Sequence, residues 1–228
     1  MATESSRNAA EYTGVKDAKK ENQGFNADRT EWRTKLVEAI EKEGHEQSRI
    51  IYVATISEKG LPTVRTCIFR GFQRGGVVIA TDKRTNKVKQ LKDKEKPVAQ
   101  VLWYFQGQKQ QFRLTGMVET IDSETKSEDQ QKIRSNFWEK MGSRSKKWNT
   151  GPTPSAPTAK TPSAKAQAEE EEIQREGGFA MEEEGFDNFA LLILHPVSVD
   201  WSDVAFGEHK LYEKDSQDAN WHALRLNP

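Results

Sequence analysis

Basic and hydroxyl side chains gather in two short stretches of this 228-residue chain. Residues 63–72 carry Arg65 and Arg70, and residues 80–91 hold a turn rich in the same side-chain types. Guanidinium and ammonium groups pair with phosphate oxygens, while hydroxyl groups donate further hydrogen bonds to them. The two stretches therefore predict a site for a phosphate monoester. The turn contributes Thr81, Arg84, Thr85 and Lys87.

Solvent exposure is the competing interpretation of each basic residue, because arginine and lysine often guard the exposed ends and edges of strands. Arg65 and Arg70 lie five positions apart, so they would face opposite sides of a regular strand. Either a bulge intervenes or the two side chains serve different parts of a site. A third stretch places Gln111 and Arg113 two positions apart, and thus on one face of a strand.

Short strands are the main elements expected to hold these residues. Runs rich in β-branched and aromatic residues alternate with turn residues, which is typical of strands joined in hairpins. Seven or eight such strands with few helices predict a closed barrel with helices around it. The expected strands are residues 49–56, 63–72, 76–81, 98–105, 111–121, 189–195, 197–201 and 220–227.

Three helices are expected beside the strands. Apolar residues from Trp32 to Ile40 recur at the spacing of one helical stripe, and Gly44 is a suitable end for that helix. A short polar helix is expected over residues 85–93. The third helix begins near Ser127, which opens a capping-box pattern.

Two segments lack the residues that build a core. Residues 1–25 contain no Leu, Ile or Trp, and residues 152–185 contain no Leu, Val, Trp or Tyr but four of the eight prolines. We expect a disordered tail over residues 1–25 and a single domain over residues 26–228, interrupted by a low-complexity insertion at residues 152–185. A regulatory role of the insertion is the alternative.

Charge and composition limit the function classes. The 35 Lys and Arg residues balance the 35 Asp and Glu residues, which argues against nucleic-acid binding through an overall field. We interpret the basic cluster at residues 144–147 as a solvated patch, so nucleic acid ranks third among the functions considered. The lone Cys67 and the lack of any apolar run near ~18 residues favour a cytoplasmic protein with no membrane partner, with the nucleus left open. The four histidines are too far apart to predict a metal site.

At the two basic stretches the sequence resembles the FMN-binding split-barrel proteins related to pyridoxamine 5′-phosphate oxidase, and most closely the Alr4036-type FMN-binding domain branch. The resemblance covers about residues 30–150 and 186–228. It rests on the shared order of a tryptophan-led helix, the hairpin AT…G.P..RT..FRGF, the turn TD.R..K..QL, the strand WYF…QFR.TG and a final NP. It implies a mainly β fold, an antiparallel six-stranded split β-barrel with flanking helices, that dimerises and holds FMN at the subunit interface.

The resemblance also implies which residues contact the cofactor. It places the tail and ring contacts of FMN on opposite sides of the arginine-led strand and across the dimer, which would account for the opposite facing of Arg65 and Arg70. The implied contacts are Arg65, Thr66, Cys67, Ile68 and Arg70 on that strand, Thr81, Arg84, Thr85 and Lys87 at the phosphate, and Gln111 at the isoalloxazine ring.

The substrate residues of pyridoxamine-phosphate oxidases are not matched in this sequence. After Trp201 the chain offers only His209 and Lys210, and no catalytic residue can be named. We therefore predict an FMN-binding flavoprotein with oxidoreductase chemistry on an unidentified small molecule. The alternative is a non-catalytic flavin-binding or regulatory split-barrel protein that has lost the substrate site.

Overall fold

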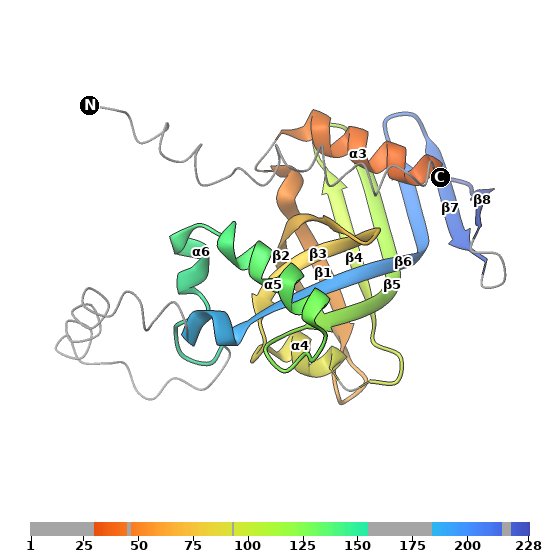
Figure 1. Cartoon of the computed structure of the whole chain (residues 1–228). Helices are drawn as coiled ribbons and strands as arrows, with labels where there is room; N and C mark the ends of the chain where they lie inside the picture. Colours follow the sequence, from red (N-terminus) through yellow and green to blue (C-terminus); the bar gives the residue numbers. More distant parts are fainter. Residues whose placement is uncertain (1–29, 45–46, 93, 155–183, 216–219) are drawn as a thin grey trace, which may run out of the picture. The chain divides into compact units, whose positions relative to one another are not determined.

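Eight strands form one sheet in the order β3-β2-β1-β4-β5-β6-β7-β8 (Figure 1). The structure, a computed structural model, describes residues 30–44, 47–92, 94–154, 184–215 and 220–228. The predicted tail and most of the predicted insertion lie outside these residues. The strands are β1 (Ile50–Ile56), β2 (Pro62–Gln73), β3 (Gly76–Asp82), β4 (Val98–Phe105), β5 (Gln110–Ile121), β6 (Phe189–Asp203), β7 (Glu208–Lys214) and β8 (Trp221–Arg225).

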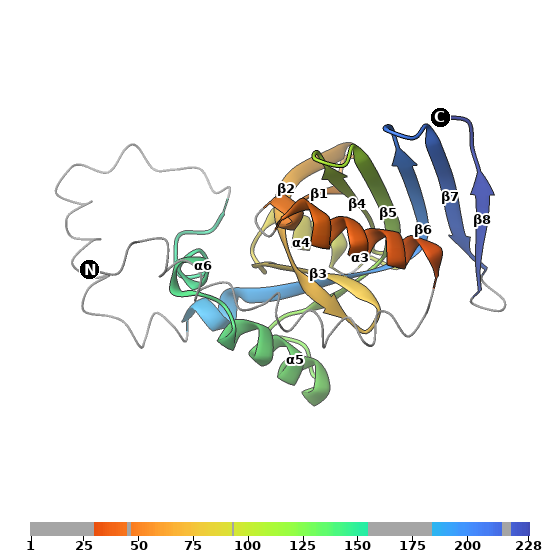
Figure 2. The same ribbon diagram turned by 90° about the horizontal axis from the view of Figure 1, so that it is seen from above.

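A second pairing, between β3 and β6, closes six of these strands into a barrel. The strands β7 and β8 continue the sheet past β6 and stand beside the barrel (Figure 2). The mainly β fold with a closed, six-stranded antiparallel barrel and flanking helices is therefore confirmed. The helices are α3 (Glu31–Glu43), η2 (Gln47–Arg49), α4 (Asn86–Leu91), α5 (Glu128–Glu139) and α6 (Ser143–Lys147).

The described residues fall into two compact units. We call the first the barrel unit, which takes its described residues from 30–80, 90–120 and 192–228. The second, the helical unit, takes its described residues from 81–89 and 121–191. Each cluster of side chains described below lies within one unit.

Aromatic side chains fill the interior of the barrel unit. The Trp103 ring lies 4.6 Å from that of Phe69 and 5.6 Å from that of Phe105. Phe105 contacts Phe112, and Phe112 in turn contacts Trp201. The indole Nε1 of Trp103 donates a hydrogen bond to the Ser48 carbonyl at 2.8 Å, so its one polar group is paired inside the core. The helix α3 buries Trp32, Leu36 and Ala39, the stripe that the sequence predicts.

The two faces of β2 differ in burial, as alternation along a strand requires. Thr63, Arg65 and Cys67 are half-buried on the inner side, and Phe69 beyond them is buried. The residues between them, Val64, Thr66 and Ile68, are exposed on the outer side.

Glycines permit the close approach of strands where the barrel closes. A Cβ added to Gly76 of β3 would lie 2.6 Å from the Ile193 side chain and 2.9 Å from the Leu194 carbonyl oxygen. A Cβ added to Gly116 of β5 would overlap the backbone of His195. Both positions therefore require a residue without a side chain.

Four of the listed elements differ from those the sequence predicts, and the first of the four is the unexpected 3-10 helix η2. Residues 189–195 and 197–201 form one continuous strand, β6, which runs through Pro196. The strand β7 and the short helix α6 are additional to the expected elements. The third helix begins as predicted, because the Ser127 side chain accepts a hydrogen bond from the backbone N–H of Gln130 at 3.5 Å.

In the helical unit, a buried arginine of α5 holds the segment that leads into β6. Arg134 donates from Nε to the Phe189 carbonyl at 3.0 Å and from Nη2 to the Phe186 carbonyl. Its Nη1 donates to Gln131 at 2.7 Å, and its guanidinium stacks on the Phe186 ring at 4.0 Å. The ring of Trp138 packs on that of Phe189 at 5.2 Å.

Candidate functional site

Arg65 lies at the centre of a hydrogen-bonded cluster in the barrel unit. Its Nη1 donates to the Val53 carbonyl at 2.9 Å and to Thr55 Oγ1 at 2.7 Å. Its Nη2 donates to Thr63 Oγ1 at 2.7 Å and to Gln90 Oε1 at 3.3 Å. The β1–β2 register pairs Thr55 with Thr63, which brings both hydroxyls to the same end of the hairpin.

The acceptors around Arg65 are all neutral. Arg74, Arg84 and Arg113 each pair with a carboxylate, whereas the acceptors of Arg65 among the described residues are carbonyl and hydroxyl oxygens. Burial lowers the pKa of Arg65, and the nearby Cys67 opposes that shift, but a guanidinium stays protonated at neutral pH. The cluster therefore holds a positive charge that no described carboxylate neutralises.

The predicted turn residues form a second cluster, in the helical unit. Lys87 Nζ donates to Thr81 Oγ1 at 2.8 Å and to Thr85 Oγ1 at 3.3 Å. The Thr85 hydroxyl donates to the Asp82 carbonyl at 2.8 Å, which fixes its position at the start of α4. The structure thus brings together three of the four residues predicted at this turn.

Arg84, the fourth turn residue, is paired with a carboxylate. Its Nε and Nη2 donate to the two oxygens of Asp82 at 3.0 and 2.7 Å, and Nη2 also donates to the Gly151 carbonyl at 2.9 Å. The hydrogen bonds that the Asp82 carboxylate accepts from Arg84 raise the pKa of Arg84. The guanidinium therefore holds the turn in shape, and its role as a phosphate contact stays a prediction.

The other predicted contacts divide between the two sides of the barrel wall. Cys67 shares the inner side with Arg65, while Thr66 and Ile68 face outward. On β5, Gln111 is half-buried and pairs in register with the exposed Tyr104 of β4. The burial pattern places Gln111 and Arg113 on one face, as predicted.

A β-bulge lies beside Arg70. The register between β2 and β3 shifts between Phe69 and Phe72, where two residues of β2 have no regular partner in β3. Gly71 within this stretch has φ +124°, a conformation that favours glycine. Of the two alternatives that the spacing of Arg65 and Arg70 left open, an intervening bulge is thus present at the Arg70 end.

Exposed apolar side chains cover the outer face of β1, β2, β4 and β5. We call this surface the outer face. Tyr52 of β1 is opposite both Thr66 of β2 and Leu102 of β4, so the exposed residues adjoin across neighbouring strands. Its large exposed members are Ile50, Tyr52, Ile56, Val64, Ile68, Val98, Tyr104 and Met117.

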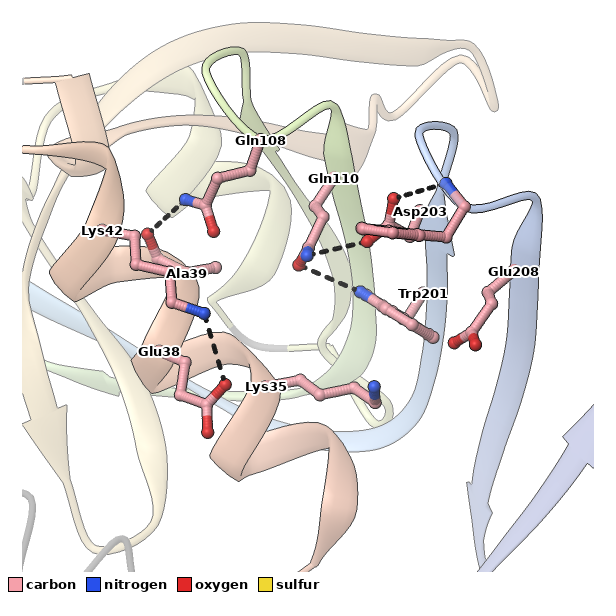
Figure 3. Close-up of a pocket in the computed structure, with 10 residues that line it drawn as sticks. Lys35, Glu38, Ala39, Lys42, Gln108, Gln110, Trp201, Asp203 and Glu208 are labelled. Atoms are coloured by element: carbon pink, nitrogen blue, oxygen red, sulfur yellow. Dashed lines mark hydrogen bonds and ion pairs between the residues drawn. The ribbon is translucent and has the colours of Figure 1, made fainter.

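A cavity of about 220 Å³ lies in the barrel unit, between α3 and the β6–β7 turn (Figure 3). Gln110 accepts from Trp201 Nε1 at 3.4 Å and donates to Asp203 at 2.9 Å, and Lys35 Nζ lies 4.0 Å above the Trp201 ring. These side chains are paired with one another, and the cavity contains none of the predicted cofactor contacts. The contacts around this cavity connect α3 to the sheet.

The two residues left as substrate candidates both have carboxylate partners. His209 Nε2 lies 3.1 Å from Asp200, which also accepts from Arg113 at 2.6 Å. Lys210 Nζ lies 2.6 Å from Glu31 of α3. Within the described ranges there is no group of three or more His, Cys, Asp or Glu side chains that could hold a metal ion, and no helix there is long and apolar enough to cross a membrane.

Sequence reasoning missed three members of the Arg65 cluster, namely Thr55, Thr63 and Gln90. Counting back from the predicted turn at residues 58–60 would have placed Thr55 opposite Thr63. No comparable signal existed for Gln90, because it comes from α4, 25 positions after Arg65.

The sequence is similar to that of a known protein family and of a protein from a plant. Residues 29–122 match the family described as "Pyridoxamine 5′-phosphate oxidase, FMN-binding domain". The chain is 27% identical over 203 residues to pyridoxine/pyridoxamine 5′-phosphate oxidase 2 of Arabidopsis thaliana, with 86% of this chain and 96% of that protein covered.

Two crystal structures share the architecture. A pyridoxamine 5′-phosphate oxidase-related, FMN-binding protein from Nostoc punctiforme superposes with a TM-score of 0.71 at 25% identity, with 87% of this chain and 98% of that chain covered. PhzG from Burkholderia lata, in complex with tetrahydrophenazine-1-carboxylic acid, has a TM-score of 0.63 at 14% identity, with 86% and 90% covered. The second likeness shows the fold alone.

Proposed function

From the confirmed resemblance of this chain to the pyridoxamine 5′-phosphate oxidase-like FMN-binding family, we propose that the protein binds FMN and is an oxidoreductase acting on a small molecule. The observation that carries this proposal is the half-buried Arg65, whose described acceptors are neutral. FMN, when bound, supplies the electron transfer, and the protein supplies binding and orientation.

The donor set of the Arg65 cluster suits a phosphate. A phosphate oxygen carries negative charge and can pair with a guanidinium through two parallel hydrogen bonds, so it competes well with a neutral hydroxyl or carbonyl oxygen for Arg65. The longest of the four bonds, to Gln90 at 3.3 Å, is the one most easily replaced. Arg65 therefore binds the phosphate of FMN in this proposal.

The Lys87 cluster, considered by itself, has a donor set of a similar kind. An ammonium group and two threonine hydroxyls lie within hydrogen-bonding distance of one another in Thr81, Thr85 and Lys87. This combination of one cation and several hydroxyl donors is suited to phosphate oxygens. Gln111 on the outer face is assigned to the isoalloxazine ring by the family resemblance.

We also propose that the outer face is the contact surface of a homodimer. An apolar surface of eight large side chains that spans four strands is larger than the scattered exposure usual for a monomer. A two-fold dimer pairs such a surface with itself and so needs no second complementary surface. Val64→Asp should give monomers in size-exclusion chromatography with light scattering, whereas Val204→Asp, equally exposed at 69% but away from this face, should not.

Flavin titration of single variants tests the cofactor proposal. Arg65→Met removes the charge but keeps much of the side-chain volume, and we expect FMN affinity to fall by roughly 10-fold to 100-fold, the effect of losing a charged hydrogen bond. Riboflavin, which lacks the phosphate, should bind equally well to both proteins. Lys87→Met tests the second cluster in the same way, and Arg113→Met is the matched control. Wild-type protein with no preference for FMN over riboflavin would refute the proposal.

A non-catalytic flavin-binding or regulatory protein is the second candidate. The carboxylate partners of His209 and Lys210 favour it, because both residues available for a substrate already have a hydrogen-bond partner. Purified protein that is yellow, bleaches with dithionite and recolours in air supports redox function. Colourless protein whose addition leaves FMN fluorescence unchanged supports a protein that has lost flavin.

A further inference from the structure

We infer that Gln90 is a positioning residue for the phosphate site, and that it sets the preference for FMN over riboflavin by orienting the hydroxyls that hold Arg65. This inference rests on the proposed FMN binding. Gln90 is absent from the predicted cofactor contacts, yet its carbonyl oxygen Oε1 meets three members of the Arg65 cluster.

Gln90 orients the hydroxyl groups of Thr55 and Thr63. Thr55 Oγ1 donates to Gln90 Oε1 at 2.6 Å, and Thr63 Oγ1 lies 3.2 Å from the same oxygen. A hydroxyl has one proton to donate and two lone pairs. When the proton points to Gln90, the lone pairs of Thr55 and Thr63 are left to accept from Arg65, as both do at 2.7 Å.

Thr55 depends on Gln90 more than Thr63 does. The Thr63 hydroxyl has a second acceptor, the Thr55 carbonyl, also at 3.2 Å. Thr55 is only 2% exposed, so its hydroxyl proton has little access to water. Without Gln90 the Thr55 proton has Thr63 Oγ1 at 3.1 Å as its remaining described partner, which would disturb the second hydroxyl as well.

Gln90 is also uncharged, so it does not neutralise the charge of Arg65. Its direct bond to Arg65, at 3.3 Å, is the longest in the cluster, so Gln90 acts mainly through the two threonines. An amide leaves the charge of Arg65 uncompensated, whereas a glutamate at the same place would form an ion pair with it. The identity of residue 90 therefore determines how much positive charge Arg65 presents to an anion.

Two substitutions at this position test the inference. Gln90→Leu removes the acceptor at similar volume, and we expect FMN to bind roughly twofold to tenfold more weakly, the effect of one net hydrogen bond. Gln90→Glu should lower FMN affinity further and remove most of the preference for FMN. Riboflavin affinity should stay unchanged in both variants, because riboflavin has no phosphate. Gln108→Leu, a half-buried glutamine that bonds to the α3 carbonyl of Ala39, is the matched control.

The ratio of FMN to riboflavin affinity separates positioning from a structural role. Equal weakening of both flavins in Gln90→Leu, or an unchanged ratio in Gln90→Glu, would overturn the inference. Should Gln90→Leu fail to fold, Thr55→Val removes the same relay at constant shape and should lower the ratio similarly. Wild-type protein without a preference for FMN would instead refute the proposed function itself.

Discussion

Replacing Gly116 with alanine should break the closure of the barrel. A Cβ at this position would overlap the carbonyl oxygen of His195 and lie 2.6 Å from its carbonyl carbon and 2.8 Å from the Cα of Pro196. All three atoms belong to the backbone of β6, the neighbour of β5 in the sheet (Figure 1). No side chain can rotate away to make room, so one strand must move.

The expected cost follows from the nature of these contacts. Overpacking a core usually costs about 1–3 kcal/mol, and more when the neighbours cannot adjust. Because the overlap involves backbone atoms of a paired strand, we expect the free energy of unfolding to fall by at least ~3 kcal/mol. This is a large share of the ~5–15 kcal/mol typical of a folded domain.

Urea unfolding followed by tryptophan fluorescence measures this loss, because Trp103 and Trp201 are buried in the barrel unit. Gly151→Ala is the control, since a Cβ there would meet nothing within 4 Å and should change stability by less than ~0.5 kcal/mol. If Gly116→Ala unfolds within ~1 kcal/mol of wild type, well short of the usual overpacking cost, the close approach of β5 and β6 is wrong.

Two further predictions concern an ion pair and a buried arginine. Burial alone would raise the pKa of Glu31, but the hydrogen bond and charge of Lys210 outweigh it and hold the pKa below its ordinary value of 4.5. Glu31 therefore contributes stability that is present above pH 4.5 and is lost as the pH falls through its folded pKa. Glu31→Gln should flatten acid unfolding curves, and an unchanged slope would contradict the pairing. Arg134→Met leaves the carbonyls of Phe186 and Phe189 without their donor and should cost about 2 kcal/mol or more; unaltered amide exchange over residues 184–189 would contradict that role.

Most strands of the barrel could be predicted because their burial pattern is simple. β4, for example, alternates buried and exposed residues over Val98–Phe105, the range that the sequence indicates. β7 was missed because EHKLYEK is mostly charged and buries only Tyr212. β6 was divided in two because proline usually interrupts a strand, yet β6 continues through Pro196, with Gly116 leaving room for the backbone beside it.

The candidate site was predictable where it is local in sequence. Thr81, Thr85 and Lys87 lie within seven positions, so the turn and the first residues of α4 are enough to bring them together. The Arg65 cluster depends on where Gln90 lies beside the β1–β2 hairpin, which only tertiary packing determines. Arg84 shows that residue type alone can mislead. An arginine in this turn suggests an anion site, but the buried Asp82 two positions earlier pairs with it.

Alternation along β2 lets two properties of the protein vary separately. A substitution at Val64 changes the outer face and leaves the hydrogen bonds of the inward-facing Arg65 intact. The apolar contacts of the outer face at Val64 can therefore change while Arg65 keeps its position. Adding or removing one residue within β2 would turn its inward-facing side chains outward and its outward-facing side chains inward. The length of this strand is therefore more constrained than its composition.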